Sequence, residues 1–158
     1  MNKDKLISII NNPKPVSIVG YTEQMANTWL CSHVLFFKVE CDANDYSRED
    51  VLAWIFSRNK TGIKLPYIDD WQKLLTNITI SPYSLDKLKL KIDSCNHEIL
   101  NSEYIISPSK LPICVEELDD VKSVYFIDNL QLYDYGPGSV ILWEKDCQFY
   151  YLEHHRES

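Results

Sequence analysis

Acidic and aromatic side chains are concentrated together in the last third of this 158-residue chain. Residues 111–158 hold three Lys or Arg residues against ten Asp or Glu residues, and this imbalance equals the net charge of −7 of the entire chain. The same stretch contains eight Phe, Tyr or Trp residues. Carboxylates steer the approach of a basic macromolecule, and aromatic rings can anchor it once it has docked. The combination indicates a surface that binds a basic partner; the alternative is a half-buried sheet with a solvated acidic face.

The densest group of acids is the pentapeptide Glu-Glu-Leu-Asp-Asp at residues 116–120. A calcium loop would need acids at alternating positions together with a glycine, and this segment has neither. A patch that pairs with Lys and Arg side chains is the functional interpretation, and a solvated turn is the alternative.

Further candidates follow from the alternation of side chains along a strand. Tyr133 and Tyr135 fall on one face and Asp134 on the other, and Trp143 and Glu144 come next in the same acidic and aromatic stretch. One face of this region has to be core, so we expect about half of its rings to be buried. The predicted partner-binding residues are Glu116, Glu117, Asp119, Asp120, Tyr133, Asp134, Tyr135, Trp143 and Glu144.

Signatures of catalysis or of metal binding do not occur in the sequence. Four glycines cannot build a Gly-rich phosphate loop, and neither Cys-x-x-Cys nor His-Glu-x-x-His is present. We interpret His154 and His155 as part of a frayed polar tail. His33 with Cys31 or Cys41 would be a thiol–base pair in a small hydrolase, although a structural histidine is the simpler interpretation. We therefore predict no catalytic residue, no metal and no cofactor.

Composition limits the class of protein further. The acidic balance argues against a nucleic-acid partner, because phosphates require a basic stripe. No apolar run approaches the roughly 20 residues of a membrane helix, and no signal peptide is visible. Five widely spaced cysteines suit reduced thiols in the cytoplasm. The length predicts one globular domain over residues 1–158, either monomeric or a homodimer.

Patterning in the first two thirds predicts both helices and strands. Residues 3–11 form an amphipathic pattern, and Ser47 with Asp50 resembles a capping box that opens a second helix. A further helix is expected from Pro66 onward. The apolar run within residues 29–41 predicts a central strand that is covered on both faces, and residues 16–21 predict a shorter strand.

Residues 87–93 alternate between polar and apolar types, which predicts a strand; a helix through Leu85, Leu88 and Ile92 is the alternative. Residues 99–106 predict a weak strand. Four short strands are then expected at residues 123–128, 130–135, 139–144 and 148–153, joined by turns short enough to force neighbouring strands to pair. The predicted fold class is α+β: a mostly antiparallel sheet of five or six strands, two or three helices packed on one face, and a C-terminal β-meander.

A small acidic α+β chain with scattered cysteines and no catalytic motif resembles bacterial immunity proteins of the contact-dependent growth inhibition type. The acidic and aromatic stretch from Val115 to Glu153 carries this resemblance. It implies a cytoplasmic protein that is not an enzyme and that neutralises a cognate toxin, often a basic nuclease. The alternatives are an adaptor or structural protein of a phage or mobile element, held by apolar contacts, and the small hydrolase mentioned above.

Overall fold

The computed structural model describes residues 1–11, 18–27, 32–41, 46–59, 71–100, 118–133, 136–145 and 148–156. Along these residues the elements are α1 (Lys3–Ile9), β1 (Ile18–Asn27), β2 (Ser32–Cys41), α2 (Arg48–Asn59), α3 (Trp71–Thr76), β3 (Thr79–Pro82), α4 (Leu85–Leu100), β4 (Ser123–Tyr133), β5 (Gly136–Lys145) and β6 (Gln148–Arg156).

The six strands form one antiparallel sheet in the order β1-β2-β6-β5-β4-β3. Three of them, β4, β5 and β6, follow one another in both sequence and space, which is the predicted meander. The α+β class and the antiparallel sheet are therefore confirmed. The meander has three long strands instead of four short ones, because Asn129 does not end β4.

Asn129 lies inside β4 with φ at 60°, at a shift in the register between β4 and β5. Asparagine tolerates this left-handed conformation better than most residues. It therefore forms an irregularity that the strand continues through, where the sequence suggested a turn.

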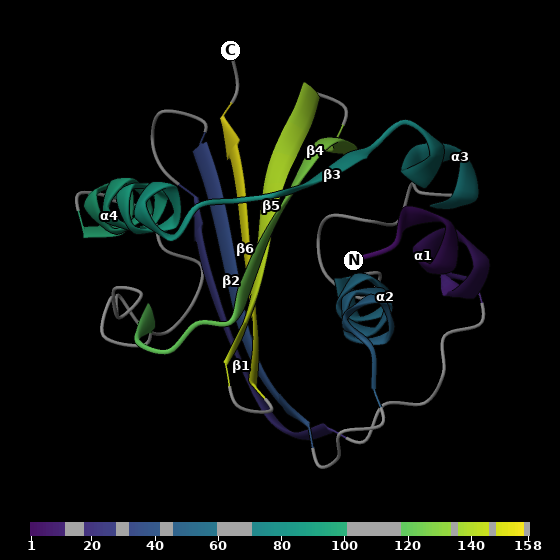
Figure 1. The fold of residues 1–158 in the computed structure, drawn as a ribbon. Coiled ribbons are helices and arrows are strands. Elements are labelled where there is room, and N and C mark those ends of the chain that lie inside the picture. Colours follow the sequence, from purple (N-terminus) through teal and green to yellow (C-terminus); the bar gives the residue numbers. More distant parts are fainter. Residues whose placement is uncertain are drawn as a thin grey trace.

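Helices cover both faces of the sheet, as Figure 1 shows with the strands seen nearly edge-on. α1, α2 and α3 lie on one side and α4 lies on the other. The prediction of helices on one face only was wrong. Apolar residues stand at successive positions in the middle strands, for example Val34 to Phe37, so both faces need cover. The prediction that this strand is buried on both faces is confirmed.

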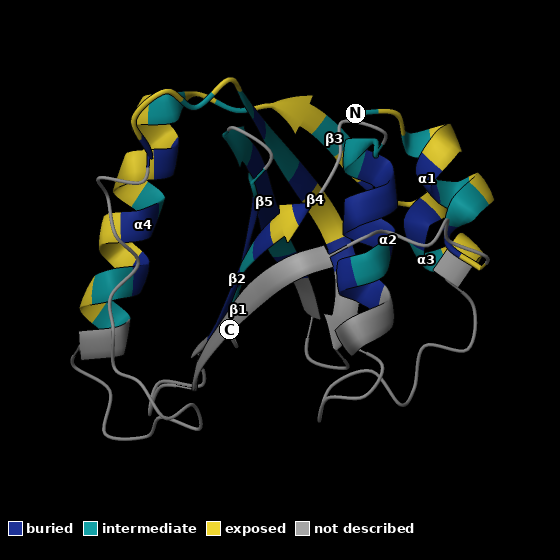
Figure 2. Ribbon diagram, turned by 90° about the horizontal axis from the view of Figure 1, so that it is seen from below, coloured by how far each residue is buried: buried dark blue, intermediate teal, exposed yellow. Residues whose placement is uncertain are grey.

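Two apolar cores result. The larger core packs α1, α2 and α3 against β2, β4, β5 and β6, and the smaller one packs α4 and Leu118 against the opposite face. In Figure 2, α2 lies between the sheet and α1, which explains why most of its described side chains, from Arg48 to Phe56, are buried.

Local chemistry explains where α2 begins. The Asp50 N–H donates to Ser47 Oγ at 3.2 Å, and the Ser47 N–H donates to Asp50 Oδ2 at 3.1 Å. This reciprocal pair is the predicted capping box.

The strand prediction over residues 87–93 was wrong, since these residues lie in the middle of α4. Leu88, Ile92 and Cys95 are fully buried toward the sheet, whereas Leu90 is 70% exposed. The helical alternative through Leu85, Leu88 and Ile92 is the one that the structure has. None of the described helices is long and apolar enough to cross a membrane.

Candidate functional site

The acidic turn, residues Asp119 and Asp120, leads from the smaller core into β4. Leu118 is buried just before it, and both aspartates are exposed to solvent. Asp120 has φ at 64°, a conformation that aspartate accepts readily. The Lys122 N–H then donates to the Glu144 carbonyl at 3.1 Å, which fixes the exit of the turn against β5. In Figure 1 this turn lies on the same side of the sheet as α4.

A stacked pair of aromatic rings lies next to the start of β4. The Tyr83 and Phe126 centroids are 5.1 Å apart with planes at 16°, and both side chains are half-buried. The Tyr83 N–H donates to the Val124 carbonyl at 3.0 Å, four residues after Asp120. The exposed acids therefore lie a few residues along the chain from a pair of partly exposed rings, and Lys87 Nζ lies 5.9 Å from the centroid of the Tyr83 ring. These are not the rings that the sequence suggested.

Trp143 is buried, so its prediction as a partner-binding anchor was wrong. Its side chain is 1% exposed. It stacks on Tyr150 at 5.2 Å and 4° and lies 6.0 Å from Phe36, on the face of the sheet that α4 covers. Both faces of β5 are buried here, with Val140 and Leu142 in the larger core and Ile141 and Trp143 in the smaller one.

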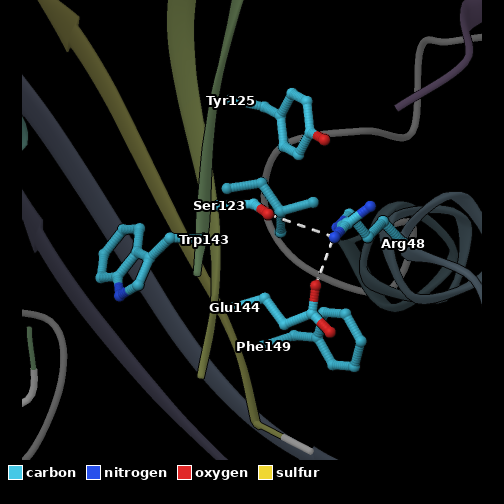
Figure 3. Close-up of a pocket in the computed structure, with 7 residues that line it drawn as sticks. Arg48, Ser123, Tyr125, Trp143, Glu144 and Phe149 are labelled. Carbon is cyan, nitrogen blue, oxygen red and sulfur yellow. Dashed lines mark hydrogen bonds and ion pairs between the residues drawn. The ribbon is translucent and has the colours of Figure 1, made fainter. Parts of the chain in front are cut away.

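Glu144 points to the opposite face, where it is paired within the protein (Figure 3). Arg48 Nε donates to Glu144 Oε2 at 2.8 Å, and Arg48 Nη2 donates to Ser123 Oγ at 3.2 Å. The guanidinium also lies over the Tyr125 ring, 5.3 Å from its centroid. Glu144 therefore already pairs with Arg48 of the protein itself, and this internal pair competes with its predicted role as a contact for a basic side chain of a toxin.

A small pocket surrounds this ion pair, and Figure 3 shows Trp143 directed away from it, on the other side of the strands. Leu142, Trp143 and Phe149 also contribute to its lining, and it has essentially no space that a water molecule could occupy. Small-molecule sites usually enclose roughly 300–1,000 Å³. The arrangement fits a brace that holds the first residue of α2 against β4 and β5, and it is too small for an ordinary substrate.

The remaining predicted contacts have less structural description. Tyr133 is the last residue of β4 and pairs with Gly136. Glu116, Glu117, Asp134 and Tyr135 lie outside the described residues.

One further acid of the C-terminal stretch is internal. Glu153 is 0% exposed, on the face of the larger core, and its Oε2 accepts a hydrogen bond of 2.7 Å from the Tyr151 hydroxyl. The exposed carboxylates that the structure describes in this stretch are Asp119, Asp120 and Asp128.

The prediction that His154 belongs to a frayed tail was wrong. β6 continues to Arg156 and pairs with β2 along its whole length. His154 Nδ1 lies 2.7 Å from Lys91 Nζ, and its Nε2 lies 3.1 Å from Glu98 Oε2. The sequence hides this cluster because residues 87–93 alternate like a strand. Read as a helix, the seven-residue spacing of Lys91 and Glu98 puts both on one face.

The thiols offer little reactivity where they are described. Cys95 is fully buried, and burial raises the pKa of its thiol to about 12, which Lys91 only partly opposes. Such a thiol is not a nucleophile near neutral pH. Cys41 is also buried. Cys31 and the side chain of His33 lie outside the described part, so the thiol–base pair stays a prediction. No three metal-ligating side chains come together within the described residues.

Comparison with known proteins does not indicate a function. No protein-family model matches the chain, and no curated protein and no solved structure matches it either.

Proposed function

We propose that this protein is an inhibitor that acts by binding: an immunity protein that neutralises a basic, nuclease-like toxin domain in the cytoplasm. The observation that carries the proposal is the solvent exposure of Asp119 and Asp120, within a stretch that holds the whole net charge of the chain. Carboxylates that face solvent on a turn raise the rate at which a basic protein associates and favour one orientation of docking.

The structure narrows the original list of contacts. Glu144 and Glu153 have partners inside the protein, and Trp143 is core. The proposed surface therefore centres on Glu116, Glu117, Asp119 and Asp120, and we add the Tyr83–Phe126 stack as an aromatic anchor. Tyr133 lies at the far end of β4, so Tyr133, Asp134 and Tyr135 stay a prediction for a second region of contact. Aromatic side chains that remain partly exposed are enriched among the anchors of protein interfaces.

The test begins with capture of the partner on the immobilised protein and its release by a salt gradient. Against the captured partner, we expect the double variant Asp119→Lys/Asp120→Lys to raise Kd by about tenfold or more, mainly through a slower association rate. The dependence of that rate on salt should become shallower.

The matched control is Asp4→Lys/Asp93→Lys, which makes the same charge change at two exposed positions, one in α1 and one in α4. It should leave Kd nearly unchanged. An equal effect of both variants would mean that only net charge matters, and an unchanged Kd in the first variant would remove the acidic turn from the interface. A partner that resists salt and binds both variants alike would favour the adaptor role instead.

A further inference from the structure

His154 forms a bridge between β6 and two successive parts of α4. Lys91, from the first half of the helix, contacts one ring nitrogen, and Glu98, from the second half, contacts the other. The His154 and Glu98 side chains are 10% and 11% exposed, so both contacts lie largely out of water.

The chemistry of the three groups fixes where the protons are. A lysine ammonium has hydrogens to donate and no lone pair, so Nδ1 of His154 has to be the acceptor. A neutral imidazole then carries its single hydrogen on Nε2, which donates it to the Glu98 carboxylate. The bridge as it stands therefore requires neutral His154.

The described neighbours of the ring can be named element by element. On the same face of the sheet its neighbours are Val34 in β2 and Ser139 in β5, neither of which is ionisable. From α4, the titratable groups that face this side are Lys91, Glu98 and the buried thiol of Cys95, which stays neutral. Asp93 and His97 are exposed and so belong to the outer side of the helix.

We infer that His154 is a proton-sensitive latch on α4. When the ring takes up a proton, Nδ1 gains an N–H that points at the Lys91 ammonium, so an attractive hydrogen bond becomes a contact between two cations. Lys91 has to move away. The Nε2 contact to Glu98 becomes an ion pair and persists. Acid therefore releases the first half of α4 and keeps the second half attached.

The released half covers the smaller core. Leu88 and Ile92 flank Lys91 on the helix and are fully buried in the cluster that contains Trp143 and Tyr150. Loosening this half of α4 lets water reach that aromatic core, so the latch makes the exposure of apolar surface depend on pH. The inference does not depend on the proposed inhibitor function.

Hydrogen exchange tests the latch directly on the full chain. Protection factors, corrected for intrinsic exchange, are measured between about pH 5 and about pH 8, the range in which a histidine changes charge. We expect the amides of Leu88 to Ile92 to lose roughly tenfold protection at the acid end, the scale of one charge-assisted hydrogen bond. Amides near Glu98 should change far less.

Three variants decide the cause. His154→Gln keeps one acceptor and one donor but cannot be protonated, and Lys91→Met removes the second cation; both should abolish the loss of protection in acid. His97→Gln alters an exposed histidine of the same helix and should keep it. A loss of protection that survives in His154→Gln or in Lys91→Met would overturn the inference, as would equal protection of Leu88 to Ile92 at both pH values in the unaltered protein. Lys91→Met guards against the possibility that His154→Gln fails to fold.

Discussion

Replacing Trp143 separates a core role from an interface role. The side chain is 1% exposed and stacks on Tyr150 with planes at 4°. Removal of a buried tryptophan side chain costs about 3–5 kcal/mol, a value that includes the lost ring stacking. A domain of this size has a total stability of about 5–15 kcal/mol. Trp143→Ala should therefore remove a large share of the free energy of unfolding while leaving a folded protein to measure.

The unpaired indole nitrogen lowers the expected cost of replacing Trp143. Among the described residues Nε1 is buried and finds no acceptor. A buried donor without a partner costs about 1–3 kcal/mol, and replacing Trp143 by either Ala or Phe removes that cost. We expect Trp143→Ala to lie near the lower end, about 3 kcal/mol. Trp143→Phe keeps an aromatic ring in the stack and loses the unpaired N–H, so it should cost about 1 kcal/mol or less.

Urea unfolding, monitored by circular dichroism, measures the free energy of unfolding of both variants, which is extrapolated linearly to water. Leu90→Ala is the control, because this large apolar side chain is 70% exposed and its loss should change stability by no more than about 0.5 kcal/mol. If Trp143→Ala cost less than about 1 kcal/mol, the residue would not be core.

Two further predictions concern titratable groups. Burial by itself would raise the pKa of Glu49, but hydrogen bonds from the Asn2 and Glu49 N–H groups, with Lys5 and Ser47, outweigh it and hold the pKa below the ordinary value of 4.5. A lowered folded-state pKa stabilises the protein above the unfolded-state value, and this stability is lost as the pH falls through the folded-state value. Glu49→Gln should therefore reduce stability near neutral pH and flatten its decline below about pH 4.5 in acid-dependent urea titrations; a decline as steep as that of the unaltered protein would contradict this assignment. Cys95, with a thiol pKa raised to about 12, should resist a maleimide at pH values near 8 in the folded protein and react readily once urea unfolds the chain, as peptide mass spectrometry would show; rapid labelling of folded protein would mean that α4 opens much more than its packing suggests.

The parts of the fold that the sequence predicted well are those with a local chemical cause. Ser47 and Asp50 make the expected capping box because both partners lie within four residues. The central strand was predictable because a short continuous apolar run is typical of a strand that is covered on both faces. By contrast, the alternation of Lys, Leu and Ile over residues 87–93 suits a strand as well as one side of a helix. Tertiary contacts settle the choice, since Leu88 and Ile92 pack on the sheet while Leu90 remains in solvent.

The candidate site was harder to predict for a related reason. Alternation along a strand assigns neighbouring residues to opposite faces, but it does not say whether both faces of the sheet are covered. That depends on α4, which lies far away in sequence and was read as a strand. The Lys91–His154–Glu98 cluster was missed for the same reason, and so was the pairing of Arg48 with Glu144 across 96 residues.

Charge in the sequence is therefore not the same as charge available to a partner. Among the described acids of the C-terminal stretch, Glu144 faces Arg48 and Glu153 faces Tyr151, while Asp119 and Asp120 project from a turn. Because helices and a turn cover both faces of the sheet, a partner can reach this part of the molecule mainly at turns, strand ends and the outer sides of helices. The outer side of α4 carries Lys87 and Lys89 beside Asp86 and Asp93, so its charges largely cancel. At the acidic turn, Asp119 and Asp120 outnumber the exposed Lys122, so a basic partner gains most from docking there.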